Sequence, residues 1–149
     1  KNIYSFDKRF LSRKSILIKK FLSNQKNKGN FIVGVHIRRG DYKNWNKGRY
    51  YFNNDFYKDV ITNLKKELIN NNKKPYFVIV SDEKKKLDIG ADYFSYGSWK
   101  EDQVILQYCD LLVGPPSTFS MWASYISEIP LVQLNSDKKQ LIKSTVCKG

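Results

Sequence analysis

Short apolar runs alternate with longer amphipathic segments along most of the chain. Each run is rich in Val, Ile, Leu or Phe and is bounded by polar, Gly or Pro residues, as is typical of buried strands. The pattern predicts strands over 31–37, 76–80, 110–114 and 129–134, and a shorter one over 92–94. Because the runs are continuous in apolar residues, both faces of each strand are expected to be covered, which favours a parallel sheet.

The segments between these runs carry apolar residues at helical spacing. They predict helices over 7–22, 53–70, 99–108 and 118–126, and a short terminal helix over 136–143. Six residues are expected on one face of the first helix: Phe10, Leu11, Leu17, Ile18, Phe21 and Leu22. Ser98 and Glu101 have the spacing of a capping box, which indicates where the third helix begins.

Strands that alternate with helices predict an α/β fold, here a Rossmann-like parallel sheet with helices on both faces. The length of 149 residues fits one domain, and neither a repeat nor a low-complexity linker divides it. We therefore expect 1–149 to form a single domain. Ligands of such sheets bind beyond the carboxyl ends of the strands, which singles out the residues after Ile37, Val80 and Val113.

Composition and charge narrow the classes of function. Lys and Arg number 27 against 14 Asp and Glu, and the formal charge of +13 favours an anionic partner such as nucleic acid, a membrane surface or a phosphorylated ligand. No apolar run approaches the ~18 residues of a membrane span. Two cysteines, Cys109 and Cys147, cannot form a disulfide framework and suit a reducing compartment. Together with one His they do not make a typical zinc site.

The segment from His36 to Tyr42 follows a predicted strand and contains two of the five arginines. Planar guanidinium groups suit bidentate contact with phosphate oxygens. Because side chains alternate along a strand, His36 and Arg38 are expected on one face and Arg39 on the other. The alternative is a surface ion pair of either arginine with Asp41.

Two further strand ends carry polar residues. Asp82 can accept hydrogen bonds from a ribose hydroxyl or a base N–H, or it can cap a helix over 83–88. After the strand that ends at Gly114, Ser117 or Thr118 can cap a helix whose free N–H groups and positive dipole end attract anions. With the arginine pair on a neighbouring strand end, this predicts a shared phosphate site. P-loop, GxGxxG and GxSxG motifs are all missing.

An ordered set of motifs runs along the chain: His36-Ile37-Arg38-Arg39-Gly40-Asp41-Tyr42, Val80-Ser81-Asp82-Glu83, and Gln107-Tyr108-Cys109-Asp110 through Ser117-Thr118-Phe119-Ser120-Met121-Trp122-Ala123, with Tyr50-Tyr51 after the first motif. This set resembles that of the GDP-fucose-dependent fucosyltransferases, most closely the α1,2-fucosyltransferases of glycosyltransferase family 11. The match is collinear from about residue 31 to 134.

The resemblance implies a GT-B enzyme with two Rossmann-like halves, of which this chain is the donor-binding one. An acceptor-binding N-terminal half is expected to be absent from the chain. Arg38 would contact the donor β-phosphate, Arg39 would support the site, and His36 with Asp82 would face the guanine. The residues expected along the pyrophosphate are Ser117, Thr118 and Phe119.

The implied reaction transfers fucose from GDP-fucose to a glycan hydroxyl with inversion and without a metal or other cofactor, since Arg and helix N–H groups can neutralise the leaving GDP. The candidate catalytic residues are Arg38 and Asp41, although Asp41 can instead serve to hold the arginine pair. The expected location is cytoplasmic, with a peripheral position at the inner face of the membrane as the alternative. The short loop 83–90 and Gly114-Pro115-Pro116 depart from the family pattern and leave the acceptor and the donor sugar open.

Two other functions stay open at this point. One is a GT-B transferase that uses another nucleotide sugar. The other is a basic nucleic-acid-binding domain, which would combine the charge of +13 with base stacking on the aromatic residues.

Overall fold

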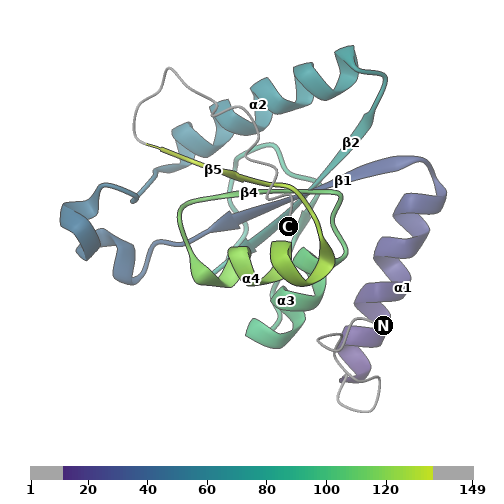
Figure 1. Cartoon of the computed structure of the whole chain (residues 1–149), viewed down its shortest axis with the longest axis horizontal. Coiled ribbons are helices and arrows are strands. Elements are labelled where there is room, and N and C mark those ends of the chain that lie inside the picture. The colour runs from purple at the N-terminus through teal and green to yellow at the C-terminus, as the bar shows by residue number, and fades with distance from the viewer. Residues whose placement is uncertain (1–11, 136–149) are drawn as a thin grey trace.

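A computed structural model gives the structure of the chain and describes residues 12–135 (Figure 1). In this part of the chain, strands form one sheet in the order β3-β2-β1-β4-β5, with every neighbouring pair parallel. The strands are β1 (Asn30–Ile37), β2 (Lys74–Ser81), β3 (Tyr93–Phe94), β4 (Leu111–Gly114) and β5 (Leu131–Gln133). The predicted strands and their parallel arrangement are confirmed.

Helices cover both faces of this sheet (Figure 1). They are α1 (Arg13–Asn27), α2 (Asn54–Asn70), α3 (Trp99–Gln107) and α4 (Thr118–Ser127). α2 packs on the face to which Val33, Val35 and Ile37 of β1 point. α1, α3 and α4 pack on the opposite face, to which Ile32 of β1 points. The two apolar clusters thus lie on either side of β1, in a Rossmann-like arrangement, as predicted.

The predicted capping box at the start of α3 is present, and its Glu101 also contacts the start of α1. One oxygen of Glu101 accepts a hydrogen bond from the Ser98 backbone N–H at 2.8 Å. The other accepts one from the Ser12 hydroxyl, also at 2.8 Å, while that hydroxyl oxygen caps α1 by accepting from the Ser15 N–H. A single carboxylate therefore joins the starts of two neighbouring helices.

Two expectations about helices were wrong: the end of the first helix and the short helix over 83–88. α1 continues to Asn27 instead of ending at residue 22, because Lys, Gln and Asn side chains extend it until Gly29 adopts a φ of +77°. Leu17 is 58% exposed and does not share the buried face. The helix considered over 83–88 is absent, and the chain there runs through bends. The predicted helix over 136–143 and the first residues of the helix predicted over 7–22 lie outside the described residues.

Two 3-10 turns, η2 (Asp41–Lys43) and η3 (Trp45–Gly48), occupy the polar stretch between β1 and α2. They place the aromatic side chains of Tyr42 and Trp45 beside the edge of the sheet at which β1, β2 and β4 end. None of the helices within residues 12–135 is both long enough and apolar enough to cross a bilayer.

Candidate active site

The carboxyl ends of the central strands meet at one edge of the sheet. Ile37 at the end of β1 pairs with Ser81 at the end of β2, and β4 ends beside β1 at Gly114. A Cβ atom added at Gly114 would lie only 2.9 Å from the carbonyl oxygen of His36. Glycine therefore allows β4 to approach β1 closely just before the chain turns into α4.

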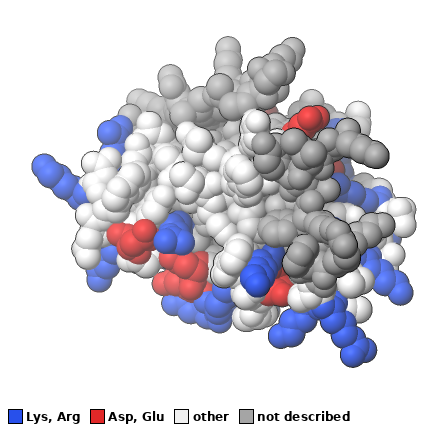
Figure 2. Space-filling model, turned by 60° about the horizontal axis from the view of Figure 1, so that its bottom comes forward, with Lys and Arg blue, Asp and Glu red and all other residues white. Residues whose placement is uncertain are grey.

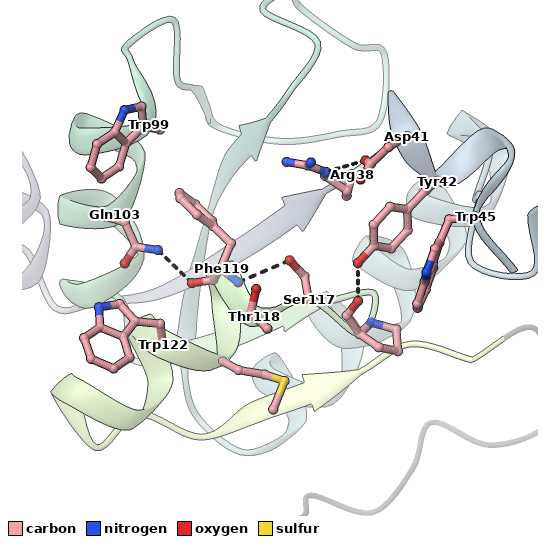
Figure 3. Close-up of a pocket in the computed structure, with 12 residues that line it drawn as sticks. Arg38, Asp41, Tyr42, Trp45, Trp99, Gln103, Ser117, Thr118, Phe119 and Trp122 are labelled. Atoms are coloured by element: carbon pink, nitrogen blue, oxygen red, sulfur yellow. Dashed lines mark hydrogen bonds and ion pairs between the residues drawn. The ribbon is translucent and has the colours of Figure 1, made fainter.

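A cavity of about 780 Å³ opens at this edge (Figure 3). Figure 3 shows Arg38 and Asp41 on the side of β1, facing Ser117 and Thr118 at the start of α4. The twelve lining residues come from three segments, 38–45, 99–103 and 116–122: Arg38, Asp41, Tyr42, Trp45, Trp99, Gln103, Pro116, Ser117, Thr118, Phe119, Met121 and Trp122. Five predicted site residues, Arg38, Asp41, Ser117, Thr118 and Phe119, are thus brought together around one cavity.

Arg38 is the cation of this cavity. Its side chain is 39% exposed, and its Nε donates a hydrogen bond to Oδ1 of Asp41 at 2.8 Å. The carboxylate of Asp82 lies 3.8 Å from the same Nε. The bond to Asp41 raises the pKa of Arg38 and holds the pKa of Asp41 below its usual value. The ion pair considered from the sequence therefore forms with Arg38, and it leaves the outer guanidinium nitrogens toward the cavity (Figure 3).

The start of α4 lies across the cavity from Arg38 (Figure 3). Ser117 is the N-cap residue, and its hydroxyl accepts a hydrogen bond from the Phe119 N–H at 3.3 Å. Thr118 is the first helical residue and is exposed. The positive end of the α4 dipole and a guanidinium group thus face one space, which is an arrangement suited to an anion.

Arg39 points away from this cavity, as strand alternation predicted. It is 7% exposed and donates three hydrogen bonds through its side chain. Its acceptors are the Phe52 carbonyl at 3.0 Å, Asn54 Oδ1 at 2.7 Å and Glu83 Oε2 at 3.1 Å. The two adjacent arginines therefore differ in kind: Arg38 is available to a ligand, whereas Arg39 joins β1 to the segment before α2 and to the end of β2.

Asp82 fixes the backbone of the first motif. Its two oxygens accept from the Arg39 N–H at 3.0 and 3.1 Å, and one of them accepts from the Gly40 N–H at 2.8 Å. Asp82 does not line the cavity, and the structure gives its carboxylate a definite role in holding the loop that carries Arg38.

His36 lies beneath the cavity and does not line it. It is 3% exposed, and its ring packs against Phe119 with centroids 5.3 Å apart. Its Nδ1 has no hydrogen-bond partner among the described residues. Burial, followed by the charge of Arg38, lowers the pKa of His36 to about 4, so the imidazole is neutral at pH 7.

Several lining residues were not predicted from the sequence. They are Tyr42, Trp45, Trp99, Gln103, Pro116, Met121 and Trp122. Tyr42, Met121 and Trp122 belong to the motifs given above, but no ligand contact was predicted for them. Trp45 belongs to none of these motifs. The sequence did contain a signal for Trp45. A tryptophan in a polar stretch, outside any helical or strand pattern, is not expected to pack in the core. The structure leaves it 48% exposed.

Comparison with protein families shows which family the chain belongs to. A model of glycosyl transferase family 11 matches residues 9–144, which is most of the chain. The chain belongs to glycosyl transferase family 11. The predicted family is confirmed, and family 11 membership implies glycosyltransferase activity, with a sugar donor and an acceptor as substrates. Neither the curated proteins nor the solved structures gave a match.

The described part of the face shown in Figure 2 carries no continuous track of cations. On the face turned forward in Figure 2, uncharged residues fill the centre, and most charged side chains lie along its lower border. Binding of a nucleic-acid backbone would favour a continuous track of cations. Within residues 12–135, no three His, Cys, Asp or Glu side chains lie together as candidate metal ligands.

Proposed function

We propose that this family 11 domain binds GDP-fucose and forms the donor-binding unit of an inverting, metal-independent fucosyltransferase. The observation that carries the proposal is the position of Arg38 opposite the N-terminus of α4 across one cavity. A diphosphate placed between them would accept hydrogen bonds from a guanidinium group on one side and from backbone N–H groups on the other.

The same two groups suit the chemistry of the leaving group. In the proposed reaction, an oxygen of the acceptor hydroxyl forms a bond to the anomeric carbon as the bond from that carbon to the β-phosphate oxygen breaks. The proton of that hydroxyl passes to a base, for which Asp41 and solvent water are the candidates. Negative charge then grows on the departing GDP. Arg38 and the α4 N-terminus are already in place to stabilise that charge, and preorganised electrostatics of this kind need no metal ion.

Asp41 has two candidate roles in this scheme. As a base it would take the proton of the acceptor hydroxyl. However, the hydrogen bond from Arg38 lowers its pKa and so weakens it as a base. We therefore assign Asp41 first to orienting Arg38, because Nε is held by Asp41 while the outer nitrogens stay available to phosphate.

The guanine end of the donor is assigned to the region of His36 and Asp82. The contact of the His36 ring with Phe119, which lines the cavity, supports this assignment, since a base bound against Phe119 would lie above the neutral imidazole. Asp82 retains acceptor capacity after binding two backbone N–H groups. Acceptor recognition in a GT-B enzyme would involve a second Rossmann-like unit.

Calorimetric titration of the full chain with nucleotides tests the proposal. GDP and GDP-fucose are expected to bind, and ADP and UDP are not. At 100 times its dissociation constant, GDP would stabilise the fold by about 2.7 kcal/mol. Arg38→Ala should weaken GDP by about tenfold or more, since a charge-assisted bond contributes about 1.5–3 kcal/mol. Arg38→Lys should restore little, because an ammonium does not reproduce the planar fork.

The matched control is Arg13→Ala, which removes an exposed arginine from the first residue of α1, outside the cavity. It should leave the affinity for GDP unchanged. Equal binding of UDP would overturn the guanine assignment, and unchanged GDP affinity in Arg38→Ala would overturn the phosphate site.

A further inference from the structure

The cavity is longer than its phosphate site, and its two ends differ in chemistry. Arg38 and Ser117 occupy the middle (Figure 3). Trp99 and Gln103 of α3 lie toward one end, and Tyr42 and Trp45 lie toward the other. A nucleotide sugar with its diphosphate in the middle would extend its base toward one end and its sugar toward the other.

Asp41 and His36 indicate which end takes which group. Asp41 belongs to the same 3-10 turn as Tyr42, so the carboxylate that orients Arg38, and that is the candidate base, lies at the Tyr42 end. The His36 ring packs on Phe119, whose carbonyl accepts a hydrogen bond from Gln103 at 2.7 Å. The α3 end therefore suits the base, and the Tyr42 end suits the transferred sugar and its acceptor.

Trp45 is held in place at this second end and is still largely open to solvent. Its ring centroid lies 4.9 Å from that of Tyr42 and 5.5 Å from that of Tyr50. The two residues after it, Asn46 and Lys47, both have left-handed backbone angles, with φ of 48° and 57°. This conformation is uncommon for residues other than glycine and is found in many ligand sites. Yet 48% of Trp45 stays exposed, so part of its ring is open to a ligand in the cavity.

The charges around the cavity restrict the ligand. Among the lining residues only Arg38 and Asp41 are charged, and they are paired with each other. When a phosphate binds the outer nitrogens of Arg38, Asp41 still holds Nε, and its carboxylate makes the net charge beside the Tyr42 end negative. An anionic acceptor would be repelled there, whereas a neutral sugar ring would not.

We propose that Trp45 is the acceptor platform: it packs against the apolar C–H face of a neutral pyranose ring of the acceptor glycan. An indole removes that face from water and offers one N–H donor to a hydroxyl group. This inference rests on the proposed function, because it takes the place of the donor from that proposal. It assigns a contact to acceptor recognition within the donor-binding domain itself.

Saturation-transfer NMR of the full chain with excess GDP tests the platform. The probes are the methyl β-glycosides of galactose, glucose and glucuronic acid. We expect saturation to reach the two neutral glycosides and not the anionic one. Trp45→Ala should lower the signal at least fivefold, and Trp45→Phe should retain part of it. The control, Tyr96→Ala, removes another exposed aromatic ring outside the cavity and should leave the signal unchanged.

Calorimetric titration of GDP into the same variants separates the two proposals. We expect the dissociation constant for GDP to stay within about twofold in Trp45→Ala, which also shows that the variant is folded. Three results would overturn the platform and leave the proposed function standing. Wild-type protein could bind GDP but neither neutral glycoside, or Trp45→Ala could bind both glycosides as wild type does. The third result is a glucuronide that binds better than the neutral glycosides. If wild-type protein does not bind GDP, the proposed function fails, and the platform fails with it.

Discussion

The hydroxyl of Tyr42 donates a hydrogen bond to the carbonyl oxygen of Pro116. The two residues are 74 positions apart, and each adjoins a different wall of the cavity. Tyr42 follows Asp41, which holds Arg38, and Pro116 precedes Ser117, which caps α4. This bond therefore links the two halves of the proposed phosphate site to each other.

Tyr42→Phe removes that link and keeps the ring. One lost hydrogen bond of about 1 kcal/mol should lower the melting temperature by a few degrees. The affinity for GDP should fall by about threefold to tenfold, because the two walls are no longer held at a fixed separation. Calorimetry and melting curves measure both effects, with Tyr51→Phe as the control on an exposed ring. An unchanged GDP affinity would show that the link is only structural.

Arg39→Ala should act on stability and spare the ligand. The variant loses three hydrogen bonds from a buried guanidinium group, one of them to a partly exposed carboxylate, at a cost of about 3 kcal/mol. Chemical denaturation measures that loss. At a temperature at which denaturation shows the variant to be folded, its dissociation constant for GDP should stay within about threefold of the wild-type value. Arg38→Ala should show the reverse pattern, and a large loss of GDP affinity in Arg39→Ala would contradict the division of roles.

His36 should make folding stability depend on pH. Its pKa is lowered to about 4 in the folded state from 6.5 in the unfolded state. Between these values only the unfolded chain binds the proton. The free energy of unfolding is therefore highest above about pH 6.5. Protonation of His36 in the unfolded chain lowers it by up to roughly 3 kcal/mol as the pH falls toward 4.

The chain has one histidine, so the titration can be observed directly. In proton NMR, the single Hε1 resonance should keep its chemical shift between pH 7 and about 5 in folded protein. Denaturation of wild type and His36→Gln at both ends of this range should show a weaker pH dependence in the variant. A midpoint near 6.5 in the folded protein would rule out the buried, neutral imidazole.

Binding of GDP is expected to persist in excess EDTA, because Arg38 and the α4 N-terminus supply the positive charge that a metal ion would otherwise provide. Titrations with and without the chelator should give the same dissociation constant. Loss of binding that Mg²⁺ or Mn²⁺ restores would contradict a metal-independent site.

Much of the fold could be predicted because its local signals agree with one another. β1 and β2 are continuous apolar runs, and α2 has both a periodic apolar face and an Asn53 cap. The end of α1 was misplaced because no apolar residue marks its last turn, where helix propensity and the position of Gly29 decide. Strand alternation also separated Arg38 from Arg39 correctly, since it depends on backbone geometry alone.

The cavity wall was harder to predict, because it is made by contacts that the sequence does not encode locally. The bond from Tyr42 to Pro116 and the ring contact of His36 with Phe119 each join residues more than seventy positions apart. Asp82 was expected to face a ligand or cap a helix, and the structure shows its carboxylate on two backbone N–H groups of the neighbouring strand end. The roles of these residues toward a donor stay predictions.

The strand order has a consequence for how the site forms as the chain is synthesised. β1 pairs with β2, which follows it, and also with β4, which comes later still. At about 5–20 residues per second, the 79 residues from Arg38 to Ser117 take about 4–16 s to translate. Asp41, the partner of Arg38 in the folded protein, follows it by only three positions. Both members of this ion pair are therefore synthesised well before the wall that Arg38 faces, and the pocket is completed only when the start of α4 has emerged.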